Sequence, residues 1–358
     1  MAKLFSAIKL RDLEVRNRIF IAPMCQYSCE KRDGVVTDWH VVHYGSRAVG
    51  GAGLIIVEAT GVTPDGRISP WDTGIWNDEQ VDAWKKVTDV IRSHGAKSAI
   101  QLAHAGRKAS TYRAISGANS VPIEDGGWQT VSSTDVPFTD YATPRKLTTE
   151  EVHEIVIAWQ RAAARSVAAG FDAIEIHAAH GYLVHQFLSP ITNHREDEFG
   201  GLLENRARLL LEIVKAIRAV IPESMPLFVR FSATDYRDDG WDLEQTKTVA
   251  GWCAALGVDL FDISSGGLVT GVNIPLGPGY QVPLAQGVAA AVSQPVSAVG
   301  MITDPKQAED ILQSGVDVIS IARQSLRDPY WPLRAAHELG VEDVKWPWQY
   351  ERGKFPKN

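Results

Sequence analysis

Short apolar runs bounded by turn residues recur along the whole chain. Four of them resemble one another, since each has a Gly turn, a small or acidic residue and then β-branched residues: GGAGLIIVE (50–58), AGFDAIEIH (169–177), LGVDLFDIS (256–264) and SGVDVISIA (314–322). Four further runs have similar boundaries: NRIFIAPM (17–24), KSAIQLAHAG (97–106), PLFVRFSA (226–233) and QPVSAVGMI (294–302). The pattern predicts eight buried strands.

The segments between these runs have helical spacing of apolar residues. Residues 148–169 begin with Thr148 as an expected N-cap, and Glu151 follows three residues later, as in a capping box. Residues 205–221 and 304–315 repeat the helical pattern. Eight alternations of strand and helix predict an α/β fold, a parallel (β/α)8 TIM barrel. A doubly wound sheet is the alternative, but no G-x-G-x-x-G follows a strand here.

Four segments exceed the strand and helix repeat. Residues 107–149, after the third strand, are rich in Ser, Thr, Gly, Asp and Pro, and loops of this length are often functional. We therefore expect a capping insertion there and a second long loop over 265–283, both at the end of the barrel where enzymes of this fold carry their active sites. Residues 1–15 are expected to plug the opposite end, and 340–358 form a C-terminal tail. The whole chain, 1–358, is expected to be a single domain.

Composition narrows the class of protein. The 358 residues carry 36 Lys and Arg against 43 Asp and Glu, a formal net charge of −7, without a basic stripe, which argues against nucleic acid as a partner. The start has no continuous apolar stretch, and the apolar run GAGLIIVEATGV is interrupted by Glu58, so we expect neither an export signal nor a membrane span. The odd number of cysteines, at Cys25, Cys29 and Cys253, fits reduced thiols in a cytoplasmic protein.

The strand ends carry the candidate residues for chemistry. Those at the expected carboxyl ends are Cys25, Tyr27, Ala59, Thr60, Gln101, His104, His177, His180, Tyr182, Arg230, Gly300 and Arg323. Carboxylates on three successive strand ends, which would indicate an enolase-type metal site, are absent from this set. In the last two loops, Gly300 permits close backbone approach and Arg323 adds charge, a pattern typical of phosphate binding in TIM barrels.

His177, His180 and Tyr182 suggest a site built from neutral donors. Two imidazole N–H groups that converge on one point would stabilise a carbonyl oxygen on which negative charge develops. A phenol, with a pKa of about 10, remains protonated at neutral pH and can give its proton to an enolate carbon. Two alternatives remain: packed core histidines, and a metal-dependent TIM-barrel hydrolase that uses His177 and His180 as ligands, although no further ligand is evident at the same rim.

Five segments resemble the Old Yellow Enzyme family, in its thermophilic-like class of NADPH dehydrogenases and xenobiotic reductases: PMCQY (23–27), QLAHAGR (101–107), EIHAAHGYL (175–183), SPITNHREDEFGG with NR after it (189–206) and QYERG (349–353). The resemblance covers nearly the entire chain. It implies an ene-reductase with noncovalent FMN, which NADPH or NADH reduces and which passes hydride to the β-carbon of an α,β-unsaturated carbonyl or related activated alkene. A non-enzymatic flavin carrier is the other alternative, and the intact Tyr182 argues against it.

The resemblance also implies roles for individual residues. Tyr182 would protonate the α-carbon, and the substrate oxygen would contact Tyr27, His177, His180 and an arginine finger from a neighbouring subunit, Arg352. The flavin would contact Pro23, Met24, Ala59, Gln101 and Arg230, with Cys25 near its N5 atom and its phosphate on Gly300, Ala322 and Arg323. We therefore expect a homodimer or homotetramer without a metal ion. Cys29 has no assigned role.

Overall fold

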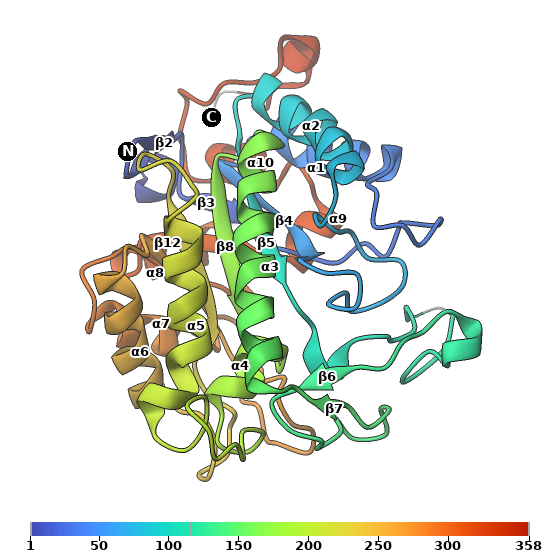
Figure 1. Cartoon of the computed structure of the whole chain (residues 1–358). Helices are drawn as coiled ribbons and strands as arrows, with labels where there is room; N and C mark the ends of the chain where they lie inside the picture. The colour runs from blue at the N-terminus through green and yellow to red at the C-terminus, as the bar shows by residue number, and fades with distance from the viewer. Residues whose placement is uncertain (1, 115, 357–358) are drawn as a thin grey trace.

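The computed structural model describes residues 2–114 and 116–356. Its centre is a closed barrel of eight parallel strands in the order β10-β11-β12-β3-β4-β5-β8-β9 (Figure 1). The strands are β3 (Ile19–Ile21), β4 (Leu54–Gly61), β5 (Lys97–Ala103), β8 (Ala173–Ala178), β9 (Leu227–Ser232), β10 (Leu260–Ser264), β11 (Val296–Ala298) and β12 (Val318–Ile321). The predicted TIM barrel is confirmed, and a doubly wound sheet is excluded because the barrel closes.

Helices surround the barrel: α1 (Asp38–Val49), α2 (Asp78–Ser93), α3 (Thr149–Ala168), α4 (Leu183–Leu188), α5 (Leu203–Arg218), α6 (Leu243–Ala255), α7 (Val282–Ala289), α8 (Pro305–Gln313), α9 (Arg323–Arg327) and α10 (Trp331–Glu338). The predicted capping box of α3 is confirmed, since Thr148 Oγ1 accepts a hydrogen bond from Glu151 N (3.2 Å) and Glu151 Oε2 accepts one from Thr148 N (2.8 Å). Among the described residues, none of these helices has the length and apolar character needed to cross a bilayer.

The N-terminal segment closes one end of the barrel, as predicted. After a short helix, η1 (Lys3–Phe5), the strands β1 (Ile8–Leu10) and β2 (Leu13–Val15) pair as an antiparallel hairpin. Ile8, Leu10 and Val15 are buried in one cluster with the first inward-facing residues of the barrel strands, among them Phe20, Leu54, Phe228 and Leu260. This apolar layer seals the end of the barrel at which the strands begin.

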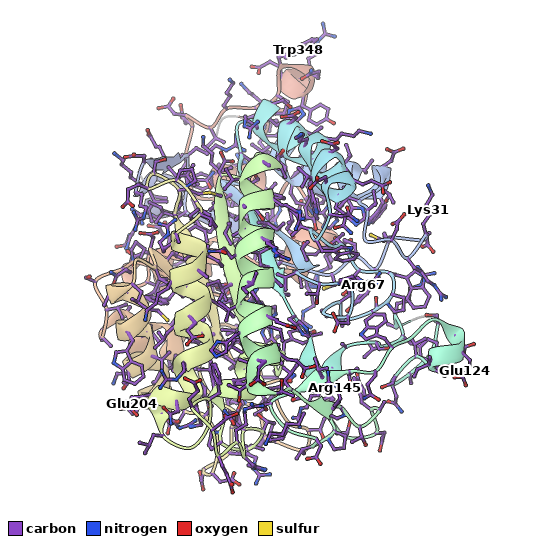
Figure 2. All side chains as sticks on the ribbon, in the orientation of Figure 1. Lys31, Arg67, Glu124, Arg145, Glu204 and Trp348 are labelled. Carbon is purple, nitrogen blue, oxygen red and sulfur yellow. The ribbon has the colours of Figure 1, made fainter. Side chains whose placement is uncertain are left out.

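The segment after β5 leaves the barrel and returns over its other end. It contains η2 (Gly106–Lys108), η3 (Ile123–Asp125) and the short parallel pair β6 (Val131–Ser132) and β7 (Arg145–Lys146). It is tied to the loop after β4, because Trp128 Nε1 donates to Asp65 O (2.8 Å) and the Arg113 guanidinium lies over the Trp71 ring (4.7 Å). Figure 2 shows Glu124 at the outer tip of this segment, away from the barrel.

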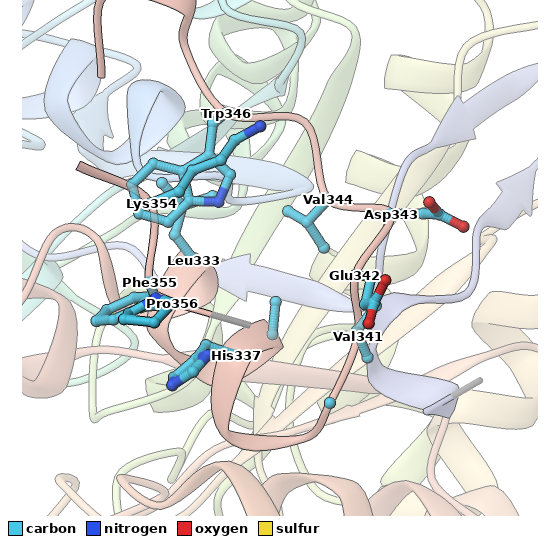
Figure 3. A pocket seen from close by; sticks show the side chains of 12 residues that line it. Leu333, His337, Val341, Glu342, Asp343, Val344, Trp346, Lys354, Phe355 and Pro356 are labelled. Atoms are coloured by element: carbon cyan, nitrogen blue, oxygen red, sulfur yellow. The ribbon is translucent and has the colours of Figure 1, made fainter. Parts of the chain in front are cut away.

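The C-terminal tail contains a short helix, η4 (Trp348–Gly353), and packs on α10 again after it. Phe355 stacks on His337 of α10 (4.5 Å between ring centroids) and meets Trp346 edge-on (5.8 Å). These side chains and α10 line a cavity of about 510 Å³ (Figure 3). Trp348 is 80% exposed and projects from the surface (Figure 2). In Figure 1 the tail lies at a different end of the molecule from α4, β6 and β7.

Candidate active site at the barrel mouth

A left-handed turn after β8 positions the histidines and the tyrosine. The backbone φ is +57° at His180 and +73° at Gly181, values that only glycine adopts without strain. His180 N donates to Ser232 Oγ (2.9 Å), which fixes the turn against β9. A Cβ atom on Gly181 would lie 2.4 Å from Gly267 O, so the loop after β10 leaves no room for a side chain there.

The two imidazoles of this turn meet at a right angle, with their ring centroids 5.1 Å apart. His177 Nδ1 accepts a hydrogen bond from Ala179 N (3.2 Å), so its proton is on Nε2, which lies 3.4 Å from His180 Nδ1. His180 Nε2 lies 2.8 Å from Ser264 Oγ. Burial, with the nearby Arg230 charge, holds the pKa of both imidazoles well below the usual value. Both rings are therefore neutral, and each offers one N–H.

Tyr182 is the N-cap residue of α4, and its ring lies edge-on to His177 (4.9 Å between centroids). Burial raises the pKa of the Tyr182 phenol well above its usual value, so the hydroxyl keeps its proton at neutral pH. The ring packs, together with Cys25, against an apolar patch that includes Ala59 and Ala103. Tyr182 is thus a protonated donor beside a neutral imidazole pair.

The loop after β3 brings Cys25 and Tyr27 to the same end of the barrel, the end at which the strands finish, which we call the mouth. Gln26 N, between them, donates to Glu58 Oε2 (2.8 Å), and Glu58 is held in turn by the Tyr44 hydroxyl (2.9 Å). Burial, reinforced by nearby carboxylates, raises the pKa of the Cys25 thiol, so it is not a thiolate nucleophile. The neighbouring Cys25 thiol, and then burial, likewise raise the pKa of the Tyr27 phenol.

A cavity of about 330 Å³ opens beside this mouth. Its lining includes Arg230, Gly300, Ala322 and Arg323, each one predicted from the sequence to contact the cofactor. Within the described ranges the Arg323 guanidinium has no hydrogen bond or ion pair to another side chain. That of Arg230 is ion-paired with Asp262 (Nε to Oδ2, 3.3 Å) but makes no hydrogen bond to another described side chain. The donors therefore fit a group that brings acceptor oxygens, as a flavin mononucleotide does.

The structure brings most of the predicted residues to the carboxyl ends of the strands, but not Arg352. Pro23 and Met24 are half-buried on the loop after β3, Ala59 lies at a bulge in β4, and Gln101 points into the barrel from β5. Arg352 lies in η4, exposed, in the tail. Within this chain it is therefore not part of the mouth.

Three functional candidates escaped the sequence analysis. Lys108 Nζ donates to His180 O and Gly267 O (both 2.8 Å) and lies 5.2 Å from the Tyr182 ring, and burial lowers the pKa of its ammonium group to about 8. Glu175 and Asp262 are fully buried inside the barrel near Arg230. The signal for the two acids was present in the sequence, as single carboxylates in the otherwise apolar runs AIEIH and LFDIS.

A metal centre lacks the ligands that it would need. Within residues 2–114 and 116–356 no group of three or more His, Cys, Asp or Glu side chains is placed to hold a metal ion. A hydrolase of the kind considered from the sequence requires three protein ligands, and His177 and His180 supply only two.

Comparison with known proteins agrees with this site. Residues 3–342 match the NADH:flavin oxidoreductase / NADH oxidase family. An NADPH dehydrogenase of Listeria monocytogenes serotype 4a is 48% identical over 353 residues, which are 98% of this chain and 99% of that protein. Morphinone reductase in complex with tetrahydroNAD superposes with a TM-score of 0.77 at 28% identity, covering 96% of this chain and 92% of that one. The Old Yellow Enzyme homologue from Zymomonas mobilis gives 0.78 at 28% identity, with 99% and 97% covered.

The chain therefore belongs to the NADH:flavin oxidoreductase / NADH oxidase family, the Old Yellow Enzyme family. It is an oxidoreductase that uses FMN as cofactor and a nicotinamide nucleotide as reductant. The resemblance read from the sequence is confirmed, and neither the hydrolase nor the carrier alternative gains support.

The turn at Gly181 can be tested against a second left-handed glycine. Gly201 also has a positive φ (+81°), but a Cβ there would meet nothing within 4 Å. Gly201→Ala should cost about 1–2 kcal/mol from backbone strain alone, whereas Gly181→Ala should lower the thermal unfolding midpoint further and reduce the FMN retained per subunit, because the turn must move away from Gly267. Equal losses in both variants would show that the close contact does not constrain the turn.

Proposed function

We propose that this protein is an ene-reductase in which the residues of the barrel mouth would hold FMN and an activated alkene. FMN, when bound, accepts hydride from NADPH or NADH and delivers it to the β-carbon of an α,β-unsaturated carbonyl or related alkene. The observation that carries the proposal is the pair of neutral imidazoles beside a protonated tyrosine, next to a cavity lined by arginines. The chain supplies donors for both partners of the reaction.

The cofactor would be held by residues from six strand ends. Pro23, Met24, Cys25 and Ala59 would line the flavin, and Gln101 and Arg230 would face its pyrimidine edge. Gly300, Ala322 and Arg323 would hold its phosphate. The support for this arrangement is that Arg230 and Arg323 line one cavity, and that the Arg323 guanidinium has no partner among the described side chains. A cationic group under the pyrimidine edge would stabilise negative charge that develops there on reduction.

The substrate oxygen would accept hydrogen bonds from both His177 Nε2 and His180 Nδ1, two nitrogens that lie 3.4 Å apart and would face it as a pair. For His180 to donate through Nδ1, its Nε2 must accept. The Ser264 hydroxyl, 2.8 Å from Nε2, supplies that proton when it turns away from Gln281 Oε1, which lies 3.3 Å from it. Tyr27 would contact the same oxygen. Because both imidazoles are neutral, they polarise the carbonyl group as hydrogen-bond donors and do not protonate it.

Tyr182 would give the proton that completes the reduction. Its high pKa keeps the hydroxyl protonated, and the carbon that it protonates becomes strongly basic only after hydride has arrived. A protein that only carried flavin would not need this donor. The oxidation of NADPH, in contrast, needs no proton on carbon.

Because only the reduction of the alkene needs a proton from Tyr182, the two half-reactions can be tested separately. Tyr182→Phe should leave anaerobic reduction of the flavin by NADPH near the wild-type rate and slow reoxidation by an enone by about 10²–10⁴-fold. Tyr236→Phe is the matched control, because Tyr236 bonds Ser265 and has no proposed role in the reaction. Stopped-flow absorbance of the flavin measures both steps. If Tyr182→Phe slowed both half-reactions equally, the residue would be structural.

The protein would act in the cytoplasm as a homodimer or homotetramer, with Arg352 entering the mouth of a neighbouring subunit. Two observations support an intersubunit role. The Arg352 side chain is exposed and has no hydrogen bond or ion pair among the described residues, and the tail lies at another end of the molecule from α4 (Figure 1). A guanidinium added to the mouth would strengthen binding of the nicotinamide nucleotide or polarise the substrate.

Complementation between variants tests the shared site. Neither Arg352→Ala nor Tyr182→Phe alone should be fully active, but mixed oligomers should regain activity, because some mouths then hold both Tyr182 and the partner's arginine. Lys345→Ala, which removes another exposed cation from the tail, is the control and should leave activity unchanged. Mixtures with proven subunit exchange that show only the summed activity of the two variants would rule out the finger.

A further inference from the structure

A layer of polar side chains fills the barrel between the N-terminal plug and the mouth. Its members are all nearly or fully buried, and they come from six neighbouring strands: Gln101, Glu175, Arg230, Asp262, Ser297 and Ser320. The strand register sets them side by side, since Gln101 is level with Glu175, and Arg230 is level with Asp262. Below this polar layer lies the apolar layer sealed by the plug. Water therefore has no described route to the layer from that side.

The charged groups of the polar layer are two carboxyls and one guanidinium. Arg230 Nε lies 3.3 Å from Asp262 Oδ2, which makes these two residues an ion pair. Glu175 has no cation within ion-pair distance among the described residues. Its Oε1 accepts from Gln101 Nε2 (2.8 Å), and its Oε2 has no hydrogen-bond partner in the part of the chain that the structure describes. Both oxygens of Asp262 also lack a hydrogen bond, and burial raises the pKa of that carboxyl as well, so the ion pair with the arginine is what distinguishes the two acids.

A second buried carboxylate would be costly. Removing an unpaired ion from water costs several kcal/mol even after relaxation, and the group avoids that cost by holding a proton. Burial, then repulsion from Asp262, raises the pKa of Glu175, while Arg230 opposes the shift. Three groups face Glu175: Gln101 from β5, Arg230 from β9 and Asp262 from β10. On β8 itself, His177 comes two residues after Glu175.

We propose that Glu175 is a neutral, proton-holding carboxyl, and that the ion pair of Arg230 with Asp262 beside it sets the reduction potential of the flavin. Arg230 connects the polar layer to the cofactor, because its side chain also lines the cavity with Ala322 and Arg323. Among the described residues, Asp262 is then the one anion in ion-pair contact with Arg230. Glu175 and Asp262 are positioning residues, since they act through Arg230. The inference rests on the proposed seating of FMN over Arg230.

The two acids should respond differently to replacement by their amides. Asp262→Asn leaves the Arg230 charge unbalanced, so it should favour reduced over oxidised flavin by about tenfold, a rise in midpoint potential of about 30 mV for a two-electron couple. Glu175→Gln replaces a neutral carboxyl by a neutral amide of similar shape, so the ratio should stay within about threefold, or about 14 mV. Ser297→Ala removes a hydroxyl next to Asp262 without changing the charge of the layer, so it is the control for the loss of a polar contact alone.

Two measurements on the holoenzyme test this assignment. The first is the midpoint potential of bound FMN in the wild type and the three variants, by equilibrium titration with a reference dye. The second is the infrared difference spectrum of the wild type minus Glu175→Gln at neutral pH, which should contain the C=O stretch of a protonated carboxyl. Subtraction removes the contribution of Asp72, a buried carboxyl whose pKa is raised to about 7. The infrared measurement needs no activity. If Asp262→Asn does not fold, the infrared comparison of the wild type with Glu175→Gln decides alone.

The outcomes separate this inference from the proposed function. A rise in potential for Asp262→Asn, none for Glu175→Gln and loss of the infrared band would support it. If Glu175→Gln raised the potential as much as Asp262→Asn, or left the infrared band in place, Glu175 would not be the protonated group and the inference would be wrong. If every variant bound FMN at an unchanged potential, the coupling would be refuted while the ene-reductase proposal stood. A wild-type protein that bound no FMN would overturn both.

Discussion

The left-handed turn after β8 is the constraint on which the mouth of this barrel depends. His180 and Gly181 take up positive φ values, and the contact of Gly181 with Gly267 leaves space only for hydrogen at that position. One short turn thereby sets two imidazole nitrogens 3.4 Å apart and places Tyr182 at the start of α4. Lys108 Nζ donates to the carbonyl groups of both His180 and Gly267, so it links the two backbone segments that meet at this contact.

The barrel below this turn is divided by polarity. The plug closes an apolar layer, the polar layer follows, and the mouth lies above it. Inward-facing residues in TIM barrels stack in such layers and are usually bulky and branched. Here the middle layer holds Arg230 and two acids, which a purely structural barrel does not require. A buried ion pair contributes little net stability compared with apolar packing, so a functional reason for its presence is favoured.

The sequence predicted the parts of this molecule that depend on local pattern. Glycine turns and β-branched runs located all eight strands, and Thr148 with Glu151 located the start of α3. The cluster of His177, His180 and Tyr182 was visible because all three lie within six residues at the end of one strand, β8. The polar layer was not found, because its partners lie on different strands and meet only through the stagger of the barrel. The setting of Lys108 likewise depends on the fold of two long loops, and neither carries a periodic signal.

The affinity for a phenol ligand tests the central claim most directly, namely that the turn after β8 clamps an oxygen with two neutral imidazoles. A phenol places its oxygen where the substrate carbonyl would lie, and its binding can be followed by the change in flavin absorbance. His177→Ala and His180→Ala should each weaken this binding by about 1.5–3 kcal/mol, the loss of one hydrogen bond to a charged oxygen. Unchanged affinity in both variants would contradict it.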